Sequence, residues 1–238
     1  MKILLITGWG GGTKLLKPLC DALHNFGHLV EVWNIFDGLD TSVLNEKAQQ
    51  AQNFDVIAGW SLGGQLATLL VQVLSEQYAM QKLLITLASN PCFIQKQDWP
   101  YAMSLDAFVD FQHSVEHQPI ETLTKFGMNV CHGTKTLKQD YQTFIQYVEP
   151  QNMRILQAGL NCLKQFNHLE YLQQNEGKQC HFFAENDALV NVNIADELST
   201  KMPNAKIVRI QGSHACVLFE AQTIASAIDQ FLGTELKS

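Results

Sequence analysis

Short apolar runs, each bounded by turn residues or a polar break, recur along the chain. Strands covered on both faces of a sheet are apolar at nearly every position, and these runs have that character. They are Lys2–Thr7, Leu29–Trp33, Phe54–Gly59, Lys82–Ala88, Cys180–Ala184 and Lys206–Ile210. Stretches of helical length separate them, at Thr13–Phe26, Leu62–Tyr78, Ala188–Met202 and Glu220–Leu232. This alternation is typical of βαβ units and predicts an α/β fold, a doubly wound, mostly parallel sheet of about six strands.

The alternation stops between about residues 104 and 170, where no strand-like run occurs. Helical spacing dominates there, as in Leu156, Leu160 and Leu163. The chain contains no internal repeat, low-complexity tract or Pro- or Gly-rich linker that would divide it. We therefore expect a single domain over residues 1–238, with a helical cap inserted at approximately 104–170.

Charge and apolar content exclude several classes of function. The formal net charge is −7, whereas a nucleic-acid surface needs a basic face, so we expect no nucleic-acid partner. No apolar run approaches the roughly 20 residues that cross a bilayer. The apolar stretch within Met1–Thr7 is also too short for a signal peptide, which predicts a cytoplasmic protein without membrane contact. We expect it to be a monomer.

The cysteines indicate neither a disulfide framework nor a metal site. The chain has six, and they are scattered without a Cys-x-x-Cys pair or a histidine at zinc spacing. They are Cys20, Cys92, Cys131, Cys162, Cys180 and Cys216. We expect reduced, mostly buried thiols and no bound metal.

Gly59-Trp60-Ser61-Leu62-Gly63 is a G-x-S-x-G motif. It directly follows one expected strand and directly precedes the helical run from Leu62, which is the context of a nucleophile elbow. Glycines are needed there because neighbouring segments pass too close for a Cβ atom. The alternative, a serine that caps a helix, would not require glycine on both sides. The motif predicts that Ser61 is a nucleophile at the carboxyl edge of the sheet.

A serine nucleophile needs a base, and the base needs an acid that fixes its tautomer. In this kind of fold the chain order is serine, acid, histidine. His214 follows the last expected strand, and Asp187 follows the strand before it, so both lie at the edge where Ser61 emerges. Glu185 is a nearby competitor for the acid, while Asp196 falls inside an expected helix. We assign Asp187 as the acid and His214 as the base.

An oxyanion must be met by backbone N–H groups that already point at it. Leu62 follows the nucleophile and supplies one, and Trp9 in the glycine-rich loop Thr7–Gly12 supplies the other. Such a loop could instead cradle phosphate. The chain lacks the Lys-Ser or Lys-Thr of a P-loop, and no acidic residue follows Leu29–Trp33 at Rossmann spacing, which disfavours that alternative.

Several stretches together resemble the pimeloyl-acyl-carrier-protein methyl ester esterases of biotin synthesis. The resemblance covers most of the chain, and the Ser89–Phe93 and Asp98–Pro100 stretches are its most restricted parts. Its motifs are Gly8-Trp9-Gly10, Gly59-Trp60-Ser61-Leu62-Gly63-Gly64, Ala88-Ser89-Asn90-Pro91-Cys92-Phe93, Asp98-Trp99-Pro100, Gly133-Thr134, Gln139-Asp140 and Ser213-His214-Ala215.

The resemblance implies a serine carboxylesterase of α/β-hydrolase fold that removes the methyl group from a pimeloyl chain attached to acyl-carrier protein. It implies no metal and no organic cofactor. It places the catalytic roles on Ser61, Asp187 and His214, in agreement with the assignment from motif order. The substrate contacts that it implies are Trp9, Ser61, Leu62, Phe126, Gly127, Met128, Asn129, Val130 and His214.

The chain departs from the family pattern at several positions. Thr7 stands where the family commonly has histidine before Gly-Trp-Gly, and Cys216 replaces a frequent proline after His-Ala. The basic cap residues of the family, chiefly arginines, correspond here to Lys125 and Lys138. Glu121 and Gln142 stand where further positive charge would be expected.

The segment Thr122–Gln139 contains three charged residues, Lys125, Lys135 and Lys138. Lys135 and Lys138 are three apart and would share a face if both lay on a helix. The segment is either a solvated helix surface or a basic edge that docks an acidic carrier protein. A broader short-chain carboxylesterase or thioesterase without a carrier partner is an alternative function. A catalytically silent binding protein is an alternative of another class.

Overall fold

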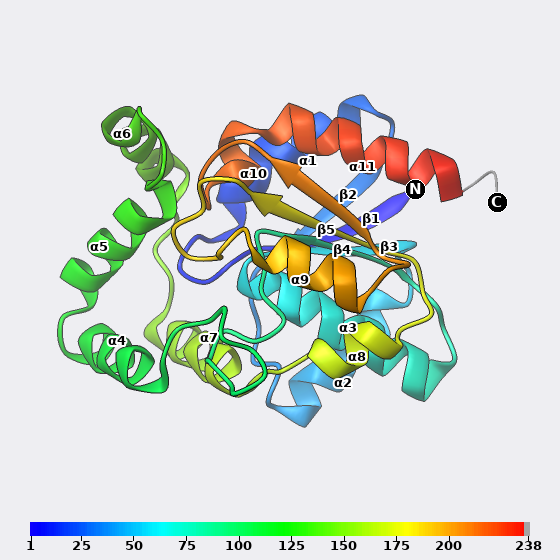
Figure 1. Cartoon of the computed structure of the whole chain (residues 1–238), viewed down its shortest axis with the longest axis horizontal. Coiled ribbons are helices and arrows are strands. Elements are labelled where there is room, and N and C mark those ends of the chain that lie inside the picture. The colour runs from blue at the N-terminus through cyan, green and yellow to red at the C-terminus, as the bar shows by residue number, and fades with distance from the viewer. Residues whose placement is uncertain (236–238) are drawn as a thin grey trace.

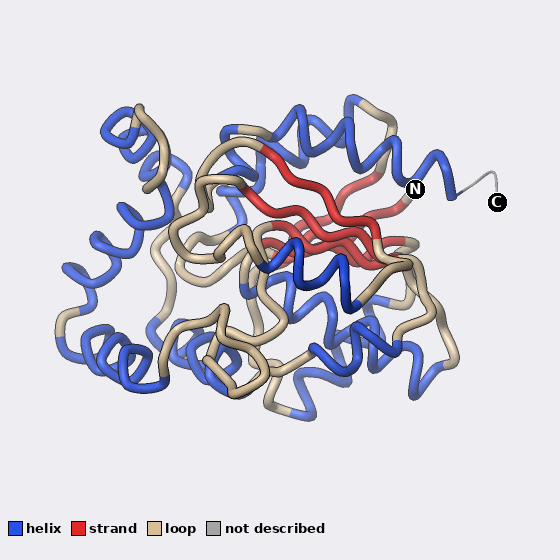
Figure 2. Tube along the Cα trace, viewed as in Figure 1, coloured by secondary structure: helices blue, strands red, loops and turns tan. Residues whose placement is uncertain are grey.

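The computed structural model describes residues 1–235. In this part of the chain, six parallel strands form one sheet in the order β2-β1-β3-β4-β5-β6 (Figures 1 and 2). The strands are β1 Lys2–Ile6, β2 Leu29–Trp33, β3 Val56–Trp60, β4 Leu83–Leu87, β5 Gln179–Ala184 and β6 Lys206–Ile210. The predicted fold class is therefore confirmed, and each apolar run corresponds to a strand.

Strand composition explains the order of the strands across the sheet. All residues of β3 and β5 are buried, whereas β2 and β6, which form the two edges, have exposed positions. Side chains alternate between the faces of a strand, so Leu4 and Ile6 join one hydrophobic core while Ile3 and Leu5 join the other. The sheet therefore needs a helical layer on both sides.

Helices cover both faces of the sheet, as Figure 1 shows. The 3₁₀-helix Thr13–Leu16, α1 (Lys17–Asn25), α10 (Cys216–Phe219) and α11 (Ala221–Glu235) lie on one face. The other face carries α2 (Thr41–Ala51), α3 (Leu62–Tyr78) and α9 (Ile194–Lys201). This arrangement leaves the carboxyl ends of the strands open for loops.

One expectation about the helices needs correction. The expected helix at Ala188–Met202 begins only at Ile194, because the Asp187 carboxylate accepts the N–H groups of Leu189 and Val190 and holds a turn there. Helix α2 lies in the stretch between the second and third expected strands, and few of its residues are apolar. Its start is marked by Asp40, whose side chain caps the first turn.

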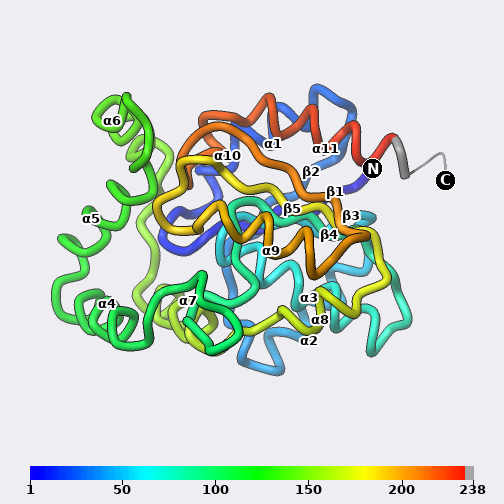
Figure 3. The backbone as a smooth tube through the Cα atoms, viewed as in Figure 1, coloured from blue at the N-terminus to red at the C-terminus, as the bar shows by residue number. Residues whose placement is uncertain are grey.

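The chain between β4 and β5 is helical, as its spacing predicts. The helices are α4 (Leu105–His117), α5 (Pro119–Cys131), α6 (Leu137–Tyr147), α7 (Met153–Gln165) and α8 (Leu169–Gln174). Figure 3 shows α4, α5 and α6 beyond the carboxyl ends of the strands, on the left. Helix α7 instead packs against α3, with Leu156, Leu160 and Leu163 in the same core as Leu66. The division of the chain into one domain and a cap remains a prediction.

The cysteines are free thiols, and all but Cys20 are buried. Within residues 1–235, no helix combines the length and the apolar character needed to cross a bilayer.

Leu70 tests the packing of α3 on the sheet. Its side chain is fully buried in the core that also contains Leu4 and Ile57. Leu70→Ala should lower the free energy of unfolding by about 2–5 kcal/mol, because it removes buried apolar area and leaves a cavity. Leu29 on the edge strand is 69% exposed, so Leu29→Ala should change it by no more than about 0.5 kcal/mol. Denaturant unfolding measures both, and equal effects would contradict this packing.

Candidate active site

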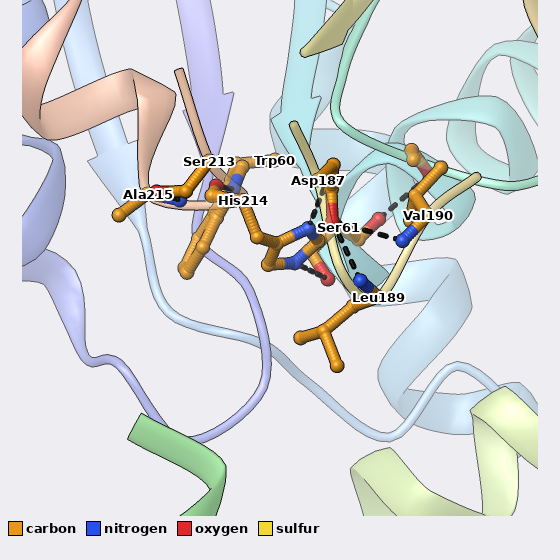
Figure 4. A network of polar contacts seen from close by, with 9 residues as sticks. Trp60, Ser61, Asp187, Leu189, Val190, Ser213, His214 and Ala215 are labelled. Atoms are coloured by element: carbon orange, nitrogen blue, oxygen red, sulfur yellow. Dashed lines mark hydrogen bonds and ion pairs between the residues drawn. The ribbon is translucent and has the colours of Figure 1, made fainter. Parts of the chain in front are cut away.

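Three side chains from separate loops meet at the carboxyl edge of the sheet (Figure 4). Ser61 lies between β3 and α3, Asp187 follows β5, and His214 follows β6. The Ser61 Oγ lies 2.9 Å from the His214 Nε2. The His214 Nδ1 lies 2.7 Å from the Asp187 Oδ2. The structure thus brings together the three residues predicted as nucleophile, base and acid, in one hydrogen-bonded chain.

Ser61 has a strained backbone. Its φ is 56° and its ψ is −122°, a conformation that residues with a Cβ rarely adopt. Local hydrogen bonds hold it: its N–H donates to the Leu87 carbonyl at 2.9 Å, and its carbonyl accepts from the Ser89 hydroxyl at 2.7 Å. Although Ser61 occupies the N-cap position of α3, its side chain makes no capping bond. The hydroxyl is directed to His214 instead.

The glycines around Ser61 are required by close backbone contacts. A Cβ at Gly59 would lie 2.0 Å from the Gly63 carbonyl oxygen, and one at Gly63 would lie 2.2 Å from that of Ile6. A Cβ at Gly64 would meet the Ser89 side chain at 2.5 Å. Because no side chain fits at these positions, β1, β3 and α3 can approach closely enough to form the turn.

Asp187 uses its two carboxylate oxygens differently. Oδ1 accepts the N–H groups of Leu189 at 2.8 Å and Val190 at 2.9 Å, whereas Oδ2 faces His214. The side chains of Asp187 and His214 are both fully buried. The aspartate therefore holds its own loop with one oxygen and orients the imidazole with the other.

The competing carboxylates are engaged elsewhere. Arg209 on β6 pairs with Asp196 at 2.6 Å and lies 3.7 Å from Glu185. Both acids therefore serve a surface ion-pair cluster around Arg209, while Asp187 reaches the histidine.

The tautomer of His214 follows from its partners. A carboxylate only accepts hydrogen bonds, so the proton lies on Nδ1 and leaves Nε2 to accept from the Ser61 hydroxyl. The His214 carbonyl also accepts from the indole N–H of Trp60 at 2.9 Å, and the two rings lie 5.2 Å apart between centroids. Trp60, the residue before Ser61, thus also fixes the backbone of His214.

Cys216 lies near this chain but differs in chemistry. Its side chain is buried in α10, and burial, followed by the charge of Asp187, raises the pKa of its thiol well above the ordinary range. The thiol therefore stays protonated at neutral pH, and a protonated thiol is a weak nucleophile.

Two backbone segments border the turn at Ser61. Leu62 is the first residue of α3, where backbone N–H groups lack helical partners and the helix dipole is positive. The glycine-rich loop passes over the elbow, since a Cβ at Gly8 would lie 3.0 Å from that of Ser61. Trp9 in this loop is anchored by its indole N–H, which donates to the Leu156 carbonyl at 2.8 Å.

An apolar cavity of about 330 Å³ opens beside the elbow. It reaches Trp9 and Trp60, the neighbours of the glycine loop and of the nucleophile, while Ser61 itself does not line it. Residues of α5 and α6 form half of its wall. The wall includes Ile120, Leu123, Phe126, Gly127, Tyr141, Phe144, Ile145 and Val148.

The predicted substrate contacts on α5 divide into two groups. Phe126 and Gly127 line the cavity. Met128 and Asn129 are exposed, and Val130 is buried in the core, so these three do not form its wall. The Val130 carbonyl instead accepts the Ala215 N–H at 3.1 Å, which ties α5 to the histidine loop.

The three lysines of the proposed docking edge do not share one helix face. Lys125 on α5 pairs with Glu121 at 2.7 Å. Lys135 lies in the turn before α6, whereas Lys138 lies on α6. The condition under which Lys135 and Lys138 would share a helical face is therefore not met, because the helix begins at Leu137.

Some residues of the site were not expected from the sequence to have a role there. Ser89 holds the Ser61 carbonyl, and the Asn90 side chain accepts from the buried Trp99 indole at 2.9 Å. Ser89, Asn90 and Trp99 lie in the Ser89–Phe93 and Asp98–Pro100 stretches, the most restricted parts of the family resemblance, so the sequence did single out these segments. Tyr141 and Phe144 line the cavity from α6, and nothing in the sequence marked them. Among the described residues, no cluster of His, Cys, Asp and Glu could hold a metal ion.

The sequence is similar to proteins named pimeloyl-[acyl-carrier protein] methyl ester esterase. The protein of Cronobacter sakazakii is 27% identical over 215 residues, which cover 86% of this chain and 82% of that protein. The protein of Pectobacterium atrosepticum is 28% identical over 242 residues, covering 94% and 93%. No protein-family model matches the chain. The resemblance inferred from the motifs is confirmed by these relatives.

Solved structures share the fold. A bromoperoxidase from Bacillus anthracis aligns with a TM-score of 0.82 at 16% identity, covering 98% of this chain and 91% of that one. An esterase from Exiguobacterium antarcticum aligns with a TM-score of 0.76 at 16% identity, covering 100% and 92%. This chain is an esterase with the α/β-hydrolase fold. Because these solved structures are only 16% identical to this chain, their similarity to it shows a shared fold and nothing about the reaction.

Gly63 tests the close packing of the elbow. Gly63→Ala would place a Cβ 2.2 Å from one backbone oxygen and 2.4 Å from another. The free energy of unfolding should fall by about 3 kcal/mol or more, since backbone must move to relieve the overlap. Gly233→Ala is the control: nothing lies within 4 Å of its Cβ position on α11. It should stabilise by up to about 1 kcal/mol. Equal thermal stability of Gly63→Ala and the native protein would disprove the crowding.

Proposed function

We propose that this esterase is a serine carboxylesterase that hydrolyses the methyl ester of a pimeloyl chain carried on acyl-carrier protein, a reaction of biotin precursor synthesis. The observation that carries the proposal is the hydrogen-bonded chain from Ser61 through His214 to the buried Asp187, beside an apolar cavity. The named relatives support the choice of substrate.

In the acylation step, the Ser61 Oγ attacks the ester carbonyl carbon while its proton passes to the His214 Nε2. Asp187 stabilises the imidazolium that forms through its bond to Nδ1. The oxyanion is met by the N–H groups of Leu62 and Trp9. The intermediate then collapses, and methanol leaves with the proton held on Nε2. The product is an acyl-enzyme on Ser61.

Deacylation repeats the sequence with water. His214 takes a proton from a water molecule, whose oxygen attacks the acyl-enzyme carbonyl. The second tetrahedral intermediate is stabilised by the same two N–H groups. Its collapse breaks the bond to the Ser61 Oγ, which regains a proton from Nε2. The free carboxylic acid then leaves, with the rest of the acyl chain still attached to its carrier.

The cavity suits an acyl chain. Its wall is largely aliphatic and aromatic, and its volume is near the lower end of ligand cavities, which span about 300–1,000 Å³. An extended chain with its ester at Ser61 could pass Trp60 and lie between α5 and α6. Ile120 at the cavity wall is 83% exposed, so the chain can continue from the cavity to a carrier outside.

One observation favours a broader carboxylesterase as a second candidate. Glu121 neutralises Lys125, and Lys135 lies apart from the face of α6, so the basic edge is weaker than three free lysines would make it. An esterase without a carrier partner would hydrolyse free p-nitrophenyl esters as efficiently as a carrier-bound methyl ester. The ratio of the two kcat/KM values distinguishes the candidates.

Ser61→Ala should leave the fold intact and lower kcat by about 10⁴-fold or more, because no acyl-enzyme can form without the hydroxyl. Asp187→Asn should lower kcat by roughly 10⁴-fold, since an amide favours the wrong tautomer of His214. Ester turnover of the purified variants measures both.

Glu185→Gln is the matched control for the acid, because Glu185 lies two residues from Asp187 and faces Arg209. It should keep kcat within about twofold of the native value. A harmless Asp187→Asn together with an inactive Glu185→Gln would show that the acid is assigned to the wrong residue.

Replacing Lys125, Lys135 and Lys138 with glutamate should raise KM for a carrier-bound ester by about 10-fold or more, and most strongly at low salt, because steering of an acidic partner is screened by ions. Hydrolysis of a small free ester should be unchanged, since the three lysines are exposed and none of them lines the cavity. Equal losses for both substrates would indicate a damaged cap. No loss for either would place the carrier elsewhere.

A further inference from the structure

Glu149 forms hydrogen bonds to the glycine-rich loop that carries Trp9 and to the residues that follow this loop. This residue follows α6, in the connector between α6 and α7. Its backbone N–H donates to the Gly11 carbonyl at 3.1 Å. Its Oε2 accepts from the Lys14 N–H at 2.9 Å and from the Thr13 hydroxyl at 3.1 Å. One acidic residue therefore bonds both to the loop and to the 3₁₀-helix that follows it.

The contact between the connector and the loop is also tight. Gly12 has a φ of 75°, and a Cβ there would lie 2.8 Å from the Glu149 Cβ and 2.7 Å from the Gln151 Nε2. Gln151 in turn donates to the Glu149 carbonyl at 3.0 Å and accepts from the Asn34 side chain at 2.7 Å. The connector is thus fixed to the body of the protein beyond β2, which makes it a firm support for the loop.

The charge of Glu149 strengthens this support. The backbone bond from Lys14 is the main cause that lowers the pKa of the Glu149 carboxyl. The group is therefore ionised at neutral pH, and its bonds to the amide and the hydroxyl are charge-assisted. Because the pKa in the folded state is lowered, this support is present above the ordinary pKa of glutamate and is lost as the pH falls through the folded value.

We propose that Glu149 is a positioning residue, which sets the place of the Trp9 N–H in the oxyanion site by fixing the Gly8–Gly12 loop. The inference rests on the proposed function, in which that N–H meets the oxyanion. An oxyanion donor acts only if it is already in place when charge develops on the substrate oxygen. Glu149 also lines the acyl cavity, so the two roles must be separated by the choice of substrate.

The test uses p-nitrophenyl acetate, whose short acyl group does not extend along the cavity. Glu149→Ala should lower kcat by about 10-fold, less than the 10²–10³-fold expected when a donor is removed outright, because the loop is loosened and not deleted. KM should stay within about twofold, since ground-state binding is unchanged. The inhibition constant of a boronic acid, which forms a tetrahedral adduct on Ser61, should rise by the same factor as kcat falls.

Two further variants keep the test decisive if Glu149→Ala folds poorly. Thr13→Val removes one donor to the carboxylate and should give a smaller loss of kcat, about two- to fivefold. Glu149→Gln keeps the shape of the side chain and removes its charge. Its loss of kcat should lie between those of Thr13→Val and Glu149→Ala. Glu116→Ala, at an exposed carboxylate on α4, should leave kcat, KM and boronic acid inhibition unchanged. Thermal unfolding of each variant reports whether it is folded.

Folded Glu149 variants with native kcat for the acetate ester would overturn the inference. So would a loss that appears only with long-chain esters, because Glu149 would then act as cavity wall. Failure of the part of the proposed function on which the inference rests, the Ser61 mechanism, gives a different result: the native enzyme would neither turn over the acetate ester through Ser61 nor bind the boronic acid.

Discussion

The close approach of three backbone segments at the turn after β3 is the constraint on which the rest of the site depends. Ser61 can leave the sheet with a positive φ only because Gly59 and Gly63 carry no side chain where β1, β3 and α3 meet. The strained turn is held by hydrogen bonds to β4 and to Ser89. Its result is a hydroxyl fixed at the carboxyl edge of the sheet, where the loops after β5 and β6 also begin (Figure 4).

Parallel topology places the other two proposed catalytic groups. Because β5 and β6 run beside each other in register, the loops that follow them emerge together, and Asp187 and His214 meet within them. Burial of both side chains excludes water from their contact, which strengthens the interaction between aspartate and imidazole. Trp60 adds a bond to the His214 carbonyl from the turn itself. Ser61, Asp187 and His214, the proposed nucleophile, acid and base, are thus placed by one edge of the sheet.

The sequence was sufficient to predict this edge of the sheet, because the patterns that mark it lie within short segments of the chain. The buried strands read as apolar runs, and the glycine pattern around Ser61 identified the elbow. The cap was less predictable. Its cavity depends on how Gly127 of α5 packs against Tyr141 and Phe144 of α6, which no pattern within one helix encodes. Likewise, the spacing of Lys135 and Lys138 does not reveal that α6 starts only at Leu137.

Two contacts join the segment between β4 and β5 to the edge of the sheet that carries Ser61. The end of α5 bonds to the histidine loop through Val130, and Glu149 bonds to the glycine loop. Covalent labelling tests the central claim most directly: a fluorophosphonate should modify the native protein once, on the peptide that contains Ser61, and His214→Ala should abolish the reaction. Modification of another residue, or unimpaired labelling without His214, would contradict a serine nucleophile activated by that histidine.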